Sequence, residues 1–187
     1  MRPPRIQVAG SAYHLTSRGN RKQEIVRDDT DRVRLLTIVR DVVLRRKWIC
    51  LAYCLMTNHY HLLVITPNPD LATGMHALNS GVARTFNKRH GYTGHLLERR
   101  YSSELILTDA HLLDTVRYIA LNPVRAGLCE FPDQWPWSSY RASIGLAPAP
   151  DFLAVDELLA LFSHRPETAQ RALEAFVMGR VAMSRAA

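Results

Sequence analysis

The sequence of 187 residues lacks the features that mark a secreted, membrane-spanning or low-complexity chain. Its three cysteines are an odd number, which does not suit a disulfide framework, and no signal-peptide pattern opens the sequence. No apolar stretch approaches the ~20 residues that a membrane-spanning helix needs. We therefore expect a globular protein in the reducing cytoplasm, away from any membrane, with Cys50 and Cys54 as small buried hydrophobic residues.

Acidic residues are also in the minority. The chain has 17 Asp and Glu against 24 Lys and Arg, which gives a formal net charge of +7, and arginine far outnumbers lysine. The planar guanidinium group suits phosphate recognition and stacking on bases. A basic chain of this kind is a candidate for nucleic-acid binding, although a solvated cationic surface with no specific partner would show the same balance.

Hydrophobic patterning predicts strands and helices in the order β-α-β-β-α-β-α. The predicted strands cover residues 12–16, 48–56, 59–66 and 101–108, and the predicted helices cover 31–47, 71–90 and 109–121. This order is typical of an α+β, ferredoxin-like split β-α-β fold, an antiparallel sheet with helices on one face. We expect residues 1–145 to form this domain and residues 146–187 to form a helical C-terminal extension, with helices at 155–162 and 167–177.

The sharpest local pattern is the sequence Asn58-His59-Tyr60-His61 at the start of a predicted strand. Because side chains alternate along a strand, His59 and His61 project on one face and Tyr60 on the other. Two imidazoles in this position can bind one divalent ion. The alternative is a pair of half-exposed histidines at a sheet edge, since such triplets also arise by accident.

A second pattern lies in the helix predicted at 109–121, where Tyr118 and Asn122 are four residues apart. They share one helix face only if the helix continues that far, and Pro123 is expected to disturb it, with Gly127 as the stop. The Tyr118 phenol can attack phosphorus and form a covalent phosphotyrosine. Alternatively, Tyr118 packs in the core with its hydroxyl bonded locally.

Together these residues suggest a phosphoryl-transfer site. Two imidazoles and the amide oxygen of Asn122 would accept Mg²⁺ or Mn²⁺, with zinc as the alternative, although no cysteine pairs have zinc-ligand spacing. The metal would offset charge on the phosphate, Tyr118 would attack, and the DNA 5′-end would stay on the tyrosine. No separate general base is evident.

Several blocks in order match a known family, namely AYHLTSRGNRKQ, CLMTNHYHLLVITP, FNKRHGYTGHLLERRYSS, RYIALNPVRAGL and WPWSSY. Over roughly residues 8–145 the sequence resembles the single-tyrosine HUH transposases, most closely their branch associated with repetitive extragenic palindromes (REP). The resemblance implies a ferredoxin-like fold, His59 and His61 as metal ligands and Tyr118 as the nucleophile. Insertion-sequence relatives commonly have Gln where this chain has the shorter Asn122.

The resemblance also implies a substrate, which is single-stranded DNA with a hairpin and a short flanking guide sequence. Basic and aromatic residues that could contact phosphates or bases are Arg18, Arg21, His95, Arg99, Arg100 and Tyr101. Insertion-sequence relatives act as dimers and the REP-associated branch can be monomeric, so we expect a monomer or a homodimer.

Two other functions remain open. The same fold class includes modules that bind single-stranded nucleic acid through aromatic residues on the sheet and carry out no chemistry. Here the candidate face carries His59 and His61 instead of aromatic residues. A degenerate relative that only represses or shapes DNA is the second alternative, and the intact His59, His61 and Tyr118 argue against it.

Overall fold

The computed structural model describes residues 7–98 and 100–185. Its strands are β1 (Ser11–Arg18), β2 (Ile49–Leu55), β3 (His59–Thr66) and β4 (Ser102–Ile106). The helices are α1 (Asp29–Arg46), α2 (Leu71–His90), α3 (Asp109–Arg125), α4 (Tyr140–Ser143), α5 (Val155–Leu159) and α6 (Pro166–Arg185), with short 3₁₀ turns η1 (Asn20–Lys22) and η2 (Pro132–Gln134). The predicted order of elements is confirmed.

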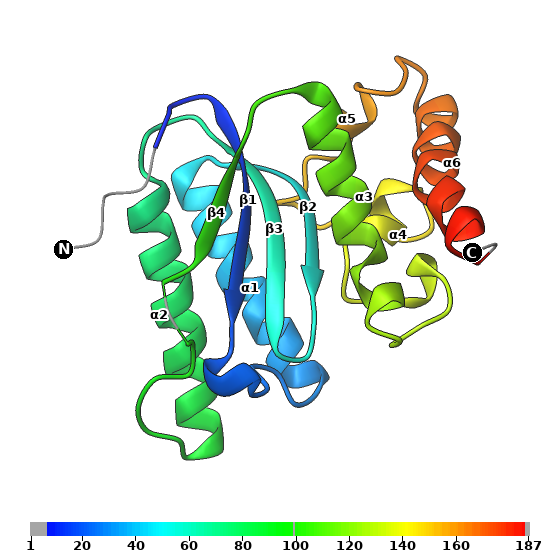
Figure 1. The fold of residues 1–187 in the computed structure, drawn as a ribbon. Coiled ribbons are helices and arrows are strands. Elements are labelled where there is room, and N and C mark those ends of the chain that lie inside the picture. The colour runs from blue at the N-terminus through cyan, green and yellow to red at the C-terminus, as the bar shows by residue number, and fades with distance from the viewer. Residues whose placement is uncertain (1–6, 99, 186–187) are drawn as a thin grey trace.

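The strands form one antiparallel sheet in the order β2-β3-β1-β4. Strand β1 lies between β3 and β4, so residues from distant parts of the sequence become neighbours at the centre of the sheet (Figure 1). This topology confirms the predicted α+β, split β-α-β fold class. The hairpin of β2 and β3 has the predicted tight connection, because Met56 N donates a hydrogen bond to His59 O.

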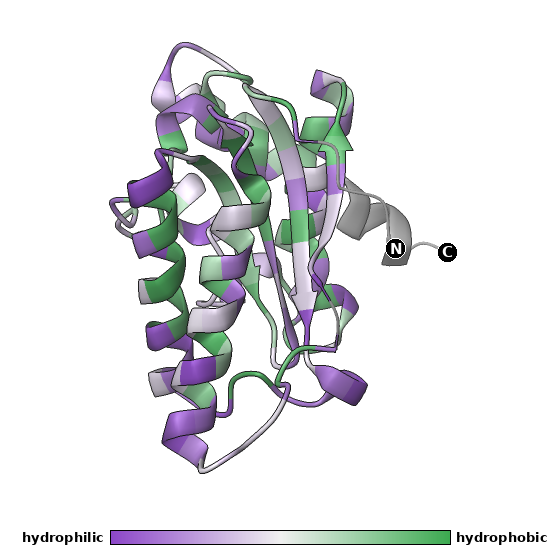
Figure 2. Ribbon diagram, turned by 90° about the vertical axis from the view of Figure 1, so that its left-hand side faces the viewer, coloured by the Kyte–Doolittle hydropathy of each residue, from purple (hydrophilic) through white to green (hydrophobic). Residues whose placement is uncertain are grey.

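Helices α1 and α2 cover one face of the sheet with apolar residues. Leu35 and Val39 from α1 and Met75 and Leu78 from α2 are at most 3% exposed. Figure 2 shows hydrophobic and hydrophilic residues alternating along both helices, as amphipathic surface helices require. The side chain of Asp28 caps α1 by accepting a hydrogen bond from Asp31 N.

The helices that the sequence predicted on one face of the sheet are α1 and α2, while α3 and the C-terminal helices pack on the other face. A second hydrophobic cluster joins β2 and β3 to α3, α5 and α6, and includes Leu63, Ile119, Leu158 and Leu173. Figure 1 shows α3 beside β2 with α4, α5 and α6 beyond it. The physical reason is that β2 is apolar on both faces: Leu55 packs toward α1 and α2, while Cys54 belongs to the second cluster.

Residues 151–185 continue this second layer, with α5 and α6 confirming the two helices that the sequence predicted there. The segment from Trp135 to Ser139 runs along the edge of β2, where Leu55 N bonds to Trp137 O and Ser139 N bonds to Tyr53 O. No helix within 7–98 and 100–185 has the length and apolar character needed to cross a membrane.

The second layer covers only part of the sheet. It packs mainly against β2 and β3, so the polar half of β1 and the start of β3 are left facing a cleft beside α3. Helix α3 borders this cleft and brings its own side chains over the strands.

Candidate active site

Strand β3 places His59 and His61 on the cleft side of the sheet and Tyr60 on the opposite side. The two imidazole rings have centroids 4.9 Å apart, while the Tyr60 side chain is 0% exposed within the core against α1 and α2. The alternation that the sequence predicted for this triplet is therefore present.

Strand β1 adds His14 and Thr16, which sequence reasoning did not select. Antiparallel pairing sets Thr16 opposite His61, and the atom Nδ1 of His61 lies 3.1 Å from Thr16 Oγ1 and 2.9 Å from His14 Nε2. The rings of His14 and His61 are stacked with centroids 5.1 Å apart. The other nitrogen of His14, Nδ1, lies 3.8 Å from a carboxylate oxygen of Glu104 on β4.

His61 is the most enclosed of these histidines, at 3% exposure. Burial, followed by the neighbouring His14, His59 and Arg18, lowers its pKa well below the usual 6.5, so the ring is neutral at physiological pH. Its Nδ1 is occupied by Thr16 and His14, whereas its buried Nε2 has no hydrogen-bond partner among the described residues. A neutral imidazole with Nδ1 protonated has its lone pair on Nε2.

His59 is partly exposed, and its Nδ1 lies 2.7 Å from Asn58 Oδ1. The side chain of Asn122 on α3 is close enough to influence its pKa. Burial, and next the positive charge of Arg18, lowers the pKa of His59, while the hydrogen bond to Asn122 opposes that shift. The strand and α3 therefore lie close together at this residue.

Helix α3 continues through Pro123, beyond the end predicted at residue 121, and the predicted stop at Gly127 is confirmed. The helix ends at Arg125, and Gly127, at φ 68°, follows its end. The tertiary packing of Leu121, Asn122 and Pro123, each buried, overrides the local preference of the residue before proline. Tyr118 and Asn122 consequently lie on one helix face, one turn apart.

Tyr118 projects into the cleft and is 39% exposed, so the alternative of a core tyrosine does not apply. Its ring centroid lies 5.5 Å from that of His61 and 5.7 Å from that of His14, and the Arg125 guanidinium carbon lies 5.0 Å from the ring centre. Tyr118 therefore lies beside the paired histidines His59 and His61.

The cleft has a volume of about 240 Å³. It is lined by His14, Thr16, Ser17, Arg18, His59, His61, Glu98, Arg100, Ser102 and Tyr118. Two of the residues predicted to contact DNA, Arg18 and Arg100, thus lie beside the paired histidines.

The other predicted DNA contacts are spread more widely. Arg21 is exposed in η1, with a positive φ of 52°, and His95 lines a neighbouring cavity and not the cleft. Tyr101 is 6% exposed and lines the same neighbouring cavity as His95. Arg99 lies outside the described residues.

The donor set fits a hard or borderline divalent cation only if an amide takes part. Over the described ranges no group of three or more His, Cys, Asp and Glu side chains could hold a metal ion. Two imidazoles and the Asn122 oxygen make a three-donor set. The buried Nε2 of His61 has no hydrogen-bond partner among the described residues, so its lone pair is available to a metal ion. These residues therefore fit a magnesium or manganese site of the predicted kind.

The sequence and the fold of this chain resemble those of known proteins. A family model described as IS200-like transposase matches residues 7–122, a span that begins before β1 and ends at Asn122. A protein of Haemophilus influenzae, provisionally named a REP-associated tyrosine transposase, is 32% identical over 104 residues, which are 50% of this chain and 59% of that protein. The chain thus spans less than two thirds of that relative.

Among solved structures, a REP-associated tyrosine transposase bound to a REP hairpin superposes with a TM-score of 0.66 at 20% identity, covering 81% of this chain and 93% of that one. The tRNA(His) guanylyltransferase of Saccharomyces cerevisiae gives a TM-score of 0.50 at 9% identity, covering 96% and 81%. Because the second protein has a different activity, these likenesses describe the fold alone.

Proposed function

We propose that this chain, which belongs to the IS200-like transposase family, is a metal-dependent endonuclease and strand transferase of single-stranded DNA that forms a 5′-phosphotyrosine intermediate. The observation that carries the proposal is the placement of Tyr118 over the His59 and His61 pair, with Asn122 one helix turn away. A nucleophile, two imidazoles and two arginines thereby line one cleft, and Asn122 lies on the same helix as the nucleophile.

The proposed metal site consists of His59, His61 and Asn122. When bound there, Mg²⁺ or Mn²⁺ would polarise the scissile phosphate and offset its developing charge. The chain's own residues keep the two imidazoles neutral by burial, which leaves their lone pairs available as ligands. His14 and Thr16 hold the His61 ring through its Nδ1, as outer-shell partners commonly do.

In the proposed cleavage step the phenolic oxygen of Tyr118 attacks phosphorus. The bond between phosphorus and the 3′-oxygen breaks, and that oxygen leaves with a proton as a free 3′-hydroxyl. The phenol proton passes to solvent, and the DNA 5′-phosphate stays esterified to Tyr118. Attack by a 3′-hydroxyl on this ester reverses the step and rejoins DNA, because the bond energy is conserved in the phosphotyrosine.

Arg18 and Arg100 are the residues we assign to the DNA backbone in the cleft, with exposed Arg21 beyond it. By analogy with the REP-associated relatives we propose a hairpin-bearing single strand as substrate, which would place the protein in the bacterial cytoplasm. Because Tyr118 lies beside His61 of its own chain, we propose a monomer in preference to a homodimer.

The test uses synthetic hairpins copied from the inverted repeats nearest the coding region, each with unpaired flanks. Incubation with Mn²⁺ or Mg²⁺ should give a covalent protein–DNA adduct that survives denaturing electrophoresis. The adduct should be absent with a chelator and absent for Tyr118→Phe, which removes only the hydroxyl. Hairpin binding by folded, metal-loaded protein with no adduct would instead identify the non-catalytic binding module or repressor.

A further inference from the structure

A second cavity among the described residues lies outside the catalytic cleft. It has a volume of about 680 Å³ and lies between α2 and the segment that precedes β4. We call it the α2 groove. Glu98 and Arg100 line both the groove and the catalytic cleft, so the two spaces meet at the edge of the sheet.

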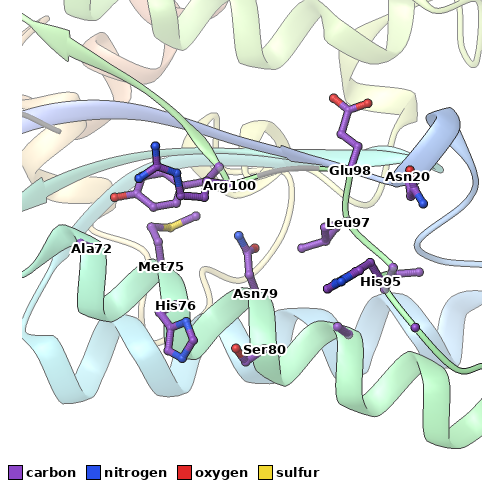
Figure 3. Close-up of a pocket in the computed structure, with 14 residues that line it drawn as sticks. Asn20, Ala72, Met75, His76, Asn79, Ser80, His95, Leu97, Glu98 and Arg100 are labelled. Carbon is purple, nitrogen blue, oxygen red and sulfur yellow. The ribbon is translucent and has the colours of Figure 1, made fainter. Parts of the chain in front are cut away.

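The α2 groove combines apolar and polar side chains. Met75 and Leu97 supply apolar surface, and Asn79, His76 and His95 supply hydrogen-bonding groups. Figure 3 shows Met75 and Asn79 rising from α2 toward the sheet, with Leu97 and His95 approaching from the opposite segment. A small number of polar groups in a mostly apolar recess is typical of sites for flat, heteroaromatic ligands.

One polar group in the groove is held in a defined orientation. The hydroxyl of buried Tyr60 donates a hydrogen bond of 2.5 Å to Asn79 Oδ1, which leaves Nδ2 as the atom that can donate to a ligand. Tyr60 stands between the two histidines of the cleft in sequence and projects to the other face of the sheet. The same strand thus positions a metal ligand on one face and a hydrogen-bond donor on the other.

We propose that the α2 groove binds one unpaired base of the DNA strand beside the phosphate that Tyr118 attacks, with Asn79 Nδ2 donating to a ring nitrogen or carbonyl oxygen of that base. This inference rests on the proposed function, since the strand must already lie in the cleft. The strand then turns around the sheet edge at Arg100, whose guanidinium faces both spaces. The apolar surface of Met75 and Leu97 packs on the base, and His95 contributes an additional stacking surface.

A base fits this groove better than a phosphate does. Among the described side chains that line it, Arg100 is the cation, and it is shared with the cleft. Glu98, which would repel a phosphate, is drawn pointing away from Asn79 and Met75 in Figure 3. The negative charge of the strand can therefore stay with the arginines of the cleft while the uncharged base enters the groove.

The experiment measures binding of a hairpin oligonucleotide whose unpaired flanks carry one abasic position at a time. Tyr118→Phe protein is used throughout so that the DNA stays intact. We expect one flank position whose abasic substitution raises Kd about tenfold, in the range measured when a stacked base is lost. In the double variant with Asn79→Asp, which keeps the acceptor for Tyr60 and removes the donor, the penalty at that position should disappear.

Ala77→Asp is the matched control, because it adds the same charge to α2 at an exposed position that does not line the groove. It should weaken binding at every position alike and leave the abasic profile unchanged. His95→Ala is a second probe at an exposed residue, and it should reduce the penalty at the same position. A flat profile for the parent, or an unchanged profile for both Asn79→Asp and His95→Ala, overturns the proposal.

The outcomes separate this inference from the proposed function. Adduct formation by the unaltered chain is scored in a separate reaction, and its failure would remove the enzyme assignment whatever the binding profile. An adduct together with a flat abasic profile would leave the enzyme assignment in place and remove the base-binding groove.

Discussion

Strands β1 and β3 present two faces with different side chains. Toward α1 and α2 they carry Leu15, Tyr60 and Leu62, all 0% exposed and packed in one hydrophobic cluster. Toward the cleft, one residue away in each case, they carry Thr16 and His61, which form a hydrogen bond across the strands. The face toward α1 and α2 contributes stability. The face toward the cleft carries polar side chains whose hydrogen-bonding atoms are only partly satisfied.

The difference shows how a small sheet can hold a reactive site. Burying an imidazole lowers its pKa and leaves polar atoms unsatisfied, as at Nε2 of His61, and both effects disfavour folding. The continuous core on the opposite face offsets that loss. We therefore expect substitutions on the two faces to separate stability from chemistry.

Leu62→Ala should produce the largest change on the covered face. Removing a fully buried leucine side chain lowers the free energy of unfolding by about 2–5 kcal/mol, through lost burial and the cavity that remains. Urea denaturation followed by circular dichroism measures it. Leu107→Ala is the control, because Leu107 is 77% exposed, and its effect should stay within about 0.5 kcal/mol.

Substitution of the preceding residue, His61→Gln, should reduce metal affinity strongly and stability only slightly. We expect the affinity for Mn²⁺ to fall by more than about a hundredfold, beyond the loss typical of an outer-shell partner. The free energy of unfolding of the metal-free protein should change by less than about 1 kcal/mol. Mn²⁺ titration followed by electron paramagnetic resonance tests this, with exposed His164→Gln as the control. Unchanged Mn²⁺ affinity would rule out His61 as a ligand.

His14→Leu should have a smaller effect on the same measurement. Loss of the contact to His61 Nδ1 should weaken Mn²⁺ binding between about tenfold and a hundredfold, since the ring is then held by Thr16 alone. His14→Gln keeps a polar atom near the position of Nε2 and should recover most of the affinity. Equal affinity for Leu and Gln variants would show that His14 only fills space.

The pH dependence of stability should show the smallest difference. Because burial lowers the pKa of His61 and His59, the unfolded chain binds protons more readily once the pH falls below about 6.5. Stability of the metal-free protein is therefore constant above that pH and decreases below it. Denaturation at several pH values should give a shallower decrease for His61→Gln, and identical slopes would contradict the assignment.

The titration of carboxylates affects stability at lower pH, so it does not overlap with the effect of the histidines. The hydrogen bond from Arg89 lowers the pKa of Asp28 from its usual 3.8, so the contribution of Asp28 to stability is lost only at pH values below that. The histidine-dependent decrease begins at higher pH and can be measured alone.

Much of the fold was predictable because local patterns and the final structure agree. The strand at 59–66 and the helix at 71–90 were predicted with the bounds that the structure has. The second helical layer was not predictable in this way, because continuous apolar runs such as β2 do not reveal whether one face or both are covered. The helix was expected to be disturbed at Pro123, but it continues to Arg125 because the buried environment of α3 outweighs a local backbone preference.

The site was predictable only where its residues are close in sequence. Strand alternation placed His59 and His61 on one face, and helix spacing placed Tyr118 and Asn122 on one face, while the family resemblance assigned their roles. His14 was missed, although it contacts His61, because the register of β1 against β3 sets that contact and no local pattern encodes it. Tyr101 was selected for its position among arginines, and such a neighbourhood does not reveal that its side chain is mostly buried and lines the α2 groove.

Helix α3 carries both Tyr118 and Asn122 without interruption. With a metal held as proposed by His59, His61 and Asn122, the position of the tyrosine and metal binding would be thermodynamically linked, because whatever stabilises the docked helix would tighten metal binding by the same free energy. Withdrawal of the tyrosine with its attached DNA would therefore weaken the metal site. In the proposed arrangement the ion would hold the tyrosine helix in place as well as take part in the chemistry.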